Sequence, residues 1–170
     1  MKSLKKTTIS VASSFALGIS SGSLAMAEEL KNVNHLLESK VCAGCELSAV
    51  MLANNDLSGV KAAGANFKKA YLVGTNLQNS TLSGANFEGA NLNGADLSNS
   101  DLNGANFAGA ELELVQLKGA LLNGTVFTDA FLMHASVDAG ALETAVLCNT
   151  VLPDATISNR DCSKILLDLK

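Results

Sequence analysis

Leucine and phenylalanine recur at every fifth position along most of this chain. Counting from Leu47 in steps of five gives 24 positions up to Cys162, of which sixteen are Leu and four are Phe. The four Phe residues stand twenty residues apart: Phe67, Phe87, Phe107 and Phe127. Neither a helix nor a strand has a natural period of five. The pattern therefore predicts a solenoid in which four five-residue sides close one turn and successive turns stack Phe on Phe.

The 24 positions divide into six turns of four sides each, which gives four inward columns of side chains. The first column runs from Leu47 through the four Phe residues to Leu147, and the other three are mainly Leu. The third column should end at Val137 and Ile157, and the fourth at Cys162. With turns about 4.8 Å apart, the coil should be a rod of roughly 25–30 Å. Its densely packed interior should leave no room for a ligand.

The polar positions of the repeat fit the corners of such a coil. The residue two after many centres is Gly or Asn, as at Gly64, Gly84 and Asn79. These two residues best tolerate the positive φ that a sharp corner requires. Asn or Asp often precedes the centre, as at Asn86 and Asp96, and we expect these side chains to bond the local backbone and to stack in ladders.

The N-terminus has the three parts of a secretory signal peptide. Lys2, Lys5 and Lys6 precede an uncharged stretch at 7–24, and Ala25-Met26-Ala27 then meets the first acidic residues. Cleavage is expected after Ala27. The alternative is an uncleaved membrane anchor, but Ser and Gly dilute the stretch, and it is a poor span of about 20 apolar residues.

These features divide the chain into four segments. We expect a signal peptide at 1–27, an N-terminal capping helix at 28–41, the repeat coil at 42–163 and a C-terminal tail at 164–170. The helix is predicted from Leu30, Val33 and Leu37, whose spacings of 3 and 4 place them on one face.

After cleavage, nine basic against sixteen acidic residues leave a net charge of −7. No basic patch remains, so nucleic-acid binding by counterion release is not expected. Once the signal peptide is cleaved, no membrane attachment is expected either.

The repeat resembles the A-[DN]-L-x-x units of the pentapeptide-repeat family. The units at 85–89 (ANFEG), 90–94 (ANLNG) and 95–99 (ADLSN) carry this resemblance, which extends over about 115 residues. It implies an all-β fold, a right-handed quadrilateral β-helix of about six turns. The ends, CAGCEL at 42–47 and the segment 147–162, resemble exported members common in cyanobacteria, which implies the periplasm or the thylakoid lumen. The resemblance implies no catalytic residues and no cofactor.

Four cysteines in an exported chain suggest disulfides. If the coil forms, Cys45 and Cys148 lie about five turns or roughly 24 Å apart, whereas bridged Cα atoms lie within about 7 Å. The expected pairs are therefore Cys42 with Cys45 and Cys148 with Cys162. In strict register Cys148 points outward and Cys162 inward, so the second pair requires the chain to leave register near Pro153. A structural role for Cys42–Cys45 is favoured over thiol–disulfide exchange, because no basic neighbour would lower a thiol pKa.

No cluster in the sequence indicates a metal site or acid–base catalysis. His35 and His134 are isolated, and neither can join both Cys pairs as zinc requires. Glu111 and Glu113 flank one centre on the same side, but solvation of the surface explains them more simply. We therefore predict neither a metal site nor an enzyme.

Apolar residues at outward positions are the unusual feature of the repeat. Outward sites of the middle turns are polar, whereas the fifth and sixth turns present a set that we predict to be an interaction patch: Leu121, Val126, Phe131, Met133, Val146 and Val151. Tyr71 and Val73 should share the face of Phe131. Exposed apolar surface of this kind usually marks an interface. The patch could instead be covered by the tail residues 165–167, and the sequence leaves both open.

The resulting hypothesis is a non-enzymatic exported rod that acts as a structural or protein-interaction module. Its partner is unknown, and the C-terminal turns could form a homodimer. The first rival is a DNA mimic that binds topoisomerase, but the coil has twelve acidic and five basic residues spread around it, and export would separate it from that target. The second rival is a thiol redox protein using Cys42 and Cys45.

Overall fold

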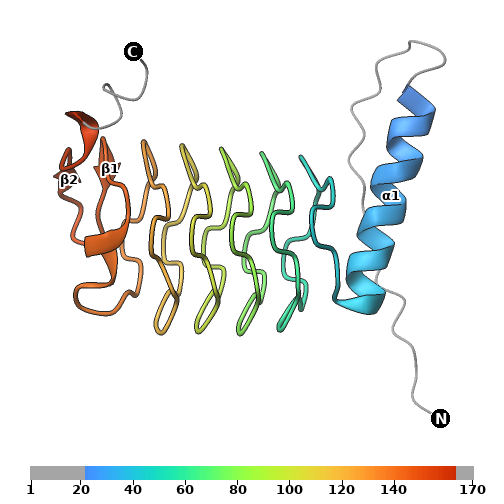
Figure 1. Cartoon of the computed structure of the whole chain (residues 1–170), viewed down its shortest axis with the longest axis horizontal. Coiled ribbons are helices and arrows are strands. Elements are labelled where there is room, and N and C mark those ends of the chain that lie inside the picture. Colours follow the sequence, from blue (N-terminus) through green and yellow to red (C-terminus); the bar gives the residue numbers. More distant parts are fainter. Residues whose placement is uncertain (1–21, 164–170) are drawn as a thin grey trace.

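The computed structural model describes residues 22–163 as one helix followed by a long coil (Figure 1). The helix, α1, spans Gly22–Ser39 and lies across one end of the coil. It begins before Glu28, so it is longer than predicted and runs through the expected cleavage point. Most of the predicted signal peptide and the tail at 164–170 lie outside the described residues. Within 22–163, no helix is long and apolar enough to span a bilayer.

Each turn of the coil contains twenty residues and has four sides. Isolated parallel bridges join residues that are twenty apart, with one series on each side, such as Asn66↔Asn86, Tyr71↔Asn91, Asn76↔Asp96 and Thr81↔Asp101. The same offset holds from Val41 to Val151, with one interruption near residue 141. Because each side offers only one bridging residue before the next corner, the chain has almost no regular strand. The predicted period of five within twenty is confirmed.

A column of stacked phenylalanine rings occupies the interior, as predicted. Phe67, Phe87, Phe107 and Phe127 are fully buried. Successive ring centroids lie 5.0, 4.7 and 5.4 Å apart, with the rings close to parallel. Leu47 and Leu147 extend the column at its two ends and are also buried. The spacing of the turns sets the spacing of the rings, because each ring occupies the same place in its own turn.

The corners are tight turns in which the third residue has positive φ. At the corner that follows Phe67, Ala70 donates its N–H to the carbonyl of Phe67 at 2.9 Å, and Lys69 has a φ of 58°. This is the backbone of a type II turn. The predicted corner residues Gly64, Gly84 and Asn79 all have positive φ. Some corners accept other residues, as Lys69 shows, at the cost of strain that glycine would avoid.

The Asn and Asp side chains that precede the centres hold the corners, as expected. Asn86 accepts a hydrogen bond from the backbone N–H of Glu88 at 3.1 Å, and Asp96 accepts one from Ser98 at 2.9 Å. Neighbouring turns are also joined, because Asn106 donates its side-chain amide to Asn86 at 3.3 Å. Both expected roles, the local bond and the ladder, are therefore present.

Buried hydroxyl groups stabilise the coil in a way that the sequence analysis did not anticipate. Thr75, Ser100, Thr125 and Thr150 take the small position that Ala usually fills, and each is buried. Their hydroxyls donate to backbone carbonyls 23 residues earlier in the chain, at 2.6–2.8 Å. Each bond therefore connects one turn to the turn before it, and the hydroxyl avoids the cost of burial without a partner.

The regular coil ends in a different arrangement near residue 140. A 3₁₀ helix, η1, spans Ala141–Thr144. In the regular turns a corner N–H bonds the carbonyl nineteen residues later, which for Gly124 would be that of Glu143. Gly124 instead donates its N–H to the carbonyl of Thr144, one residue further on. The offset is restored at Val126↔Val146. Strand β1, Thr150–Val151, then pairs antiparallel with strand β2, Ile157–Ser158. The chain has therefore reversed its direction.

This reversal corrects one prediction about the core. Ile157 was expected to point inward in the third column, but its side chain is 61% exposed. It follows a hairpin and does not continue the coil, so it has no place in the interior. Val137, Leu142 and Leu152, which end the other columns, are only half-buried because no further turn stacks on them. The disulfide argument correctly required the chain to leave register near Pro153.

Candidate interaction surface

One face of the coil is apolar towards both of its ends and polar in its middle. We call it the Phe131 face, and its bridging residues are Met51, Tyr71, Asn91, Glu111, Phe131 and Val151. Its middle is polar, where Glu111 accepts a hydrogen bond from the side chain of Asn93 at 3.1 Å. Beyond Glu111 the face becomes apolar.

Three apolar side chains lie on neighbouring strands at the C-terminal end of this face. Phe131 bridges to Val151, and Val151 in turn pairs with Ile157 of β2. We call these three residues the apolar row. Phe131 is 37% exposed and Ile157 is 61% exposed, while Val151 between them is half-buried. The reversal that removed Ile157 from the core therefore places it beside the predicted patch, which the sequence analysis missed.

The other predicted patch residues lie on more than one face. Val126 and Val146 pair with each other on the face before the Phe131 face, and both are half-buried. Leu121 pairs with Asp101 on another face and is 56% exposed. Met133 is half-buried and stands two residues after Phe131, beside the apolar row. The apolar positions thus surround the C-terminal turns, and only the Phe131 face brings several of them together across adjacent strands.

The N-terminal end of the same face is also apolar. Met51 and Tyr71 bridge to each other, and both are exposed to more than a third. Asn91 and Glu111 separate this pair from the apolar row. The Phe131 face therefore carries two apolar regions with a polar centre between them.

Both ends of the coil hold a disulfide, in the pairs that the spacing predicts. Cys42 joins Cys45 with the Cα atoms 5.3 Å apart, and Cys148 joins Cys162 with the Cα atoms 4.8 Å apart. Cys42 is almost fully buried, and its sulfur lies 3.7 Å from the carbonyl oxygen of Asn32 in α1. Its partner Cys45 is half-buried, so the contact of Cys42 with α1, more than burial of the pair, favours a structural role.

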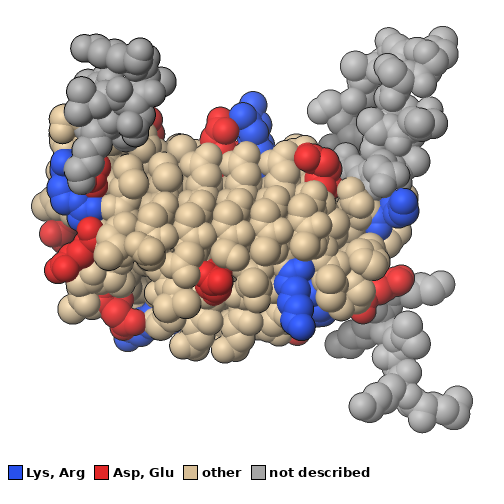
Figure 2. All heavy atoms as spheres, in the orientation of Figure 1, with Lys and Arg blue, Asp and Glu red and all other residues tan. Residues whose placement is uncertain are grey.

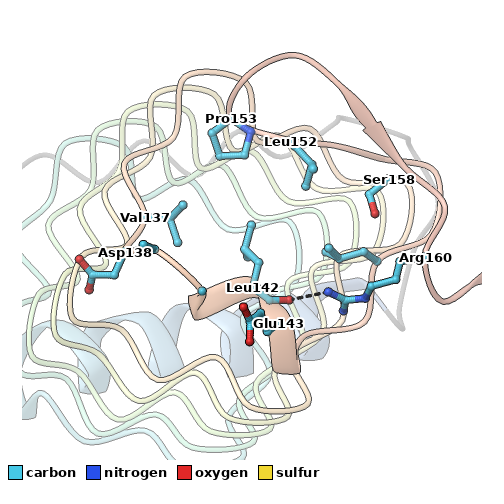
Figure 3. Close-up of a pocket in the computed structure, with 11 residues that line it drawn as sticks. Val137, Asp138, Leu142, Glu143, Leu152, Pro153, Ser158 and Arg160 are labelled. Carbon is cyan, nitrogen blue, oxygen red and sulfur yellow. Dashed lines mark hydrogen bonds between the residues drawn. The ribbon is translucent and has the colours of Figure 1, made fainter.

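Three consecutive polar residues cover one side of the last turn. Asn159 accepts the N–H of Asn149 at 3.0 Å, and Asp161 accepts that of Leu147 at 3.1 Å. Arg160 pairs with Asp161 at 2.8 Å. Arg160 also donates to the carbonyl of Leu142 at 3.1 Å (Figure 3), and to the carbonyl of Ala145. These side chains take the place of the next turn, and the sequence analysis did not find them because they follow no repeat.

The carboxyl groups whose pKa departs from its ordinary value accept hydrogen bonds within the tight turns. Hydrogen bonds from Ser58 hold the pKa of Asp56 below its usual value, and those from Thr156 do the same for Asp154. For Asp96, partial burial raises the pKa, but hydrogen bonds from Ser98 and Gln78 outweigh it, so the pKa is lowered. A general acid needs a raised pKa, so these shifts reflect turn structure and do not indicate catalysis.

The predicted histidine and glutamate candidates stay apart. Within residues 22–163, no three His, Cys, Asp or Glu side chains are grouped so that they could hold a metal ion. His134 lies near Glu113, with 3.8 Å between Nδ1 and the carboxylate. His35 lies on α1, at the opposite end of the coil.

Comparison with known proteins places this coil in a family. The family described as pentapeptide repeats matches residues 42–79 and 80–118 in 8 copies. The chain belongs to the pentapeptide-repeat family. Members of this family form right-handed quadrilateral β-helices. No curated protein sequence matches the chain.

Several solved pentapeptide-repeat structures are similar to this one. Rfr23 from the cyanobacterium Cyanothece 51142 is 26% identical, with a TM-score of 0.62, and the match covers 75% of this chain and 97% of that protein. QnrB1, a plasmid-mediated fluoroquinolone resistance protein, is 19% identical with a TM-score of 0.53, and the match covers 75% and 71% of the two chains. The likeness to QnrB1 shows the shared fold alone.

The apolar row lies beyond the segment that matches the family. The matched pentapeptide repeats end at residue 118, whereas the parallel bridges continue to Val151. The coil geometry thus persists after the typical repeat sequence has faded. Outward apolar residues appear in this later part, where folding of the coil alone does not require them.

Proposed function

We propose that this pentapeptide-repeat protein is a non-enzymatic, exported, rod-like interaction module that docks a protein partner through the C-terminal end of its Phe131 face. The partner is a protein surface with its own apolar patch, and a second copy of the chain is one such surface. The apolar row carries the proposal, because Phe131, Val151 and Ile157 expose apolar atoms side by side on adjacent strands.

The energetics favour burial of this row. Each large apolar side chain gains about 1.5–3 kcal/mol when it is fully buried. Phe131 and Ile157 are exposed, and Met133 beside them is half-buried. A regular coil of this family tolerates polar residues at all such sites, as Asn91 and Glu111 show on the same face. Apolar residues are therefore not required at these sites for the coil to form, and the row gains further free energy when another surface covers it.

Export to the periplasm or the thylakoid lumen is part of this proposal. The basic start, the apolar stretch and the Ala25-Met26-Ala27 site motivate it. The two disulfide pairs also support it, because such bonds persist in oxidising compartments.

We also infer that the coil has about six turns and that α1 caps the first of them. Val33 and Leu36 of α1 are buried against the core of the coil. Just after α1, the carbonyl of Lys40 accepts the N–H of Lys61 at 2.8 Å. An uncovered first turn would present unpaired backbone groups to other chains, and the helix covers this end.

Charge supports docking over DNA mimicry. One broad face of the coil presents few charged side chains, and they are widely separated (Figure 2). Lys68 and Glu88 offset each other in an ion pair at 2.9 Å. A mimic of DNA would need dense rows of negative charge, since the duplex has one charge for about every 1.7 Å of its length.

Substitution of Phe131 tests the proposal. Phe131→Glu places a charge in the apolar row without touching the inward columns, so the melting temperature should stay nearly unchanged. Light scattering should show a fall from dimer to monomer, or a partner captured from the exported compartment should be lost. Leu114→Glu is the matched control, because Leu114 is exposed but lies outside the row. If the wild type is monomeric and Phe131→Glu alters neither binding nor solubility, the docking surface is wrong.

A further inference from the structure

The C-terminal end of the coil is an open apolar cavity. It has a volume of about 440 Å³, and its lining includes the last residues of all four inward columns: Val137, Leu142, Leu147 and Leu152 (Figure 3). Leu147 is buried, but the other three are only half-buried. The cavity is therefore the exposed cross-section of the core, at the place where a seventh turn would stack.

Nothing among residues 22–163 fills this cavity. The residues that cover the last turn, Asn159 to Asp161, bond one side of it only. Arg160 lines the cavity, yet its guanidinium is engaged by Asp161 and by the carbonyls of Leu142 and Ala145. Two carboxylates, Asp138 and Glu143, also line it. An occupant should therefore be largely apolar with a net positive charge.

We propose that the chain's own C-terminal residues, 164–170, fill this cavity and close the core. Their sequence, KILLDLK, contains four large apolar residues and one acidic residue, Asp168, with a lysine at each end. The apolar residues match the lining, and the two lysines outnumber Asp168, so the side chains of the segment have a net charge of +1 to set against the two carboxylates. The cavity and the segment that closes it are therefore complementary in both hydrophobicity and charge.

The attachment of the segment favours this occupant over a second copy. Cys162 is bonded to Cys148, with their Cα atoms 4.8 Å apart. Cys148 is the next residue in the chain after Leu147, which lines the cavity. Five extended residues reach about 17 Å, so Leu167 can enter the cavity from Cys162. A tethered segment acts at an effective concentration in the millimolar range, far above that of a second molecule in solution.

This inference is independent of the docking function. The sequence allowed the tail to cover the outward apolar residues. Under this proposal residues 164–170 occupy the cavity instead, which leaves Phe131 and Ile157 free for a partner. None of the three residues of the apolar row lines the cavity. The two ideas can therefore fail separately.

Tryptophan fluorescence tests the proposal in the full chain, which contains no natural Trp. Leu167→Trp should emit at short wavelength and resist quenching by acrylamide, whereas the exposed control Leu114→Trp should emit at long wavelength. Adding Leu142→Asp at the cavity lining should shift the Leu167→Trp emission to longer wavelength. Adding Phe131→Glu should leave it unchanged. Far-UV circular dichroism checks that each double variant is folded.

Other results would overturn the proposal. If the Trp of Leu167→Trp emits at the same long wavelength as the Leu114→Trp control and is quenched equally by acrylamide, the tail is exposed to water and does not fill the cavity. Emission that responds to Phe131→Glu but not to Leu142→Asp places the tail on the apolar row. A short-wavelength signal that is lost on dilution, together with dimer mass in light scattering, assigns the cavity to a second copy.

Truncation after Ser163 provides a second measurement that does not depend on the probe. Opening the cavity to water should lower the melting temperature by about 3–10 °C in a chain of this length. Substituting both lysines, Lys164→Ser with Lys170→Ser, should lower the melting temperature by a smaller amount. High salt should lower the melting temperature of the wild type in the same direction, because it screens the attraction between the lysines and the carboxylates. An unchanged melting temperature after truncation would contradict the closure of the core by the tail.

Discussion

The Phe column allows the stacked coil to be tested by measuring unfolding. Phe87 is fully buried and contacts two rings, Phe67 with centroids 5.0 Å away and Phe107 with centroids 4.7 Å away. Phe67 has only one ring neighbour, Phe87, because Leu47 occupies the place on its other side. Phe87→Ala therefore removes two ring contacts, and Phe67→Ala removes one.

The expected losses follow from these contacts. Phe→Ala in a packed core costs about 3–5 kcal/mol of unfolding free energy, and each aromatic pair contributes about 0.5–1.5 kcal/mol beyond burial. Phe87→Ala should therefore cost about 0.5–1.5 kcal/mol more than Phe67→Ala, which has one pair fewer to lose. Phe87→Leu is the matched control. Leu fits this column at Leu47 and Leu147, so the loss should be about 1–3 kcal/mol, mainly from the two ring pairs.

Urea unfolding followed by far-UV circular dichroism, with the disulfides intact, measures these losses. The slope of free energy against urea should stay constant across the series if the coil unfolds as one unit. Equal losses for Phe67→Ala and Phe87→Ala would refute the neighbour-by-neighbour account of the coil. A Phe87→Leu variant as stable as the wild type would show that ring stacking contributes little. A changed slope would show that part of the coil unfolds separately.

Three further predictions concern processing, the C-terminal disulfide and acid stability. Protein recovered from the exported compartment should have the intact mass of a chain that begins at Glu28, and full-length protein in the cytosol would contradict export. Replacing Cys148 and Cys162 with Ser should lower the unfolding free energy by about 3 kcal/mol, the entropy of a loop of about 15 residues, and a loss below 1 kcal/mol in urea unfolding would contradict this. The lowered pKa of Asp96 stabilises the fold above its unfolded pKa, about 3.9, and this contribution disappears as pH falls through the folded pKa. The urea midpoint of Asp96→Asn should therefore fall less below pH 4 than that of the wild type, and identical pH profiles would refute the assignment.

Much of this fold could be predicted from the sequence because the coil repeats its own contacts. Every residue in the middle turns meets the residue twenty positions away, as Asn86 meets Asn66 and Asn106. The same chemistry therefore has to recur every twenty residues, and the pattern reveals the turn length, the Phe column and the corners. The disulfide pairs follow from the same spacing, because turns that are far apart along the rod cannot be bridged.

Only the tertiary structure decided what happens at the C-terminal end. There the last turn has no neighbour above it, so its contacts come from residues that follow no period. Arg160 and Asp161 bond the open turn in place of another side, and Ile157 leaves the core to join the surface beside Val151. The pattern of five could predict neither, because it describes turns that are stacked on both sides. The repeat register thus identified Phe131 and Val151 as outward residues, but the row that they form with Ile157 and the cavity beside it depend on how the chain reverses.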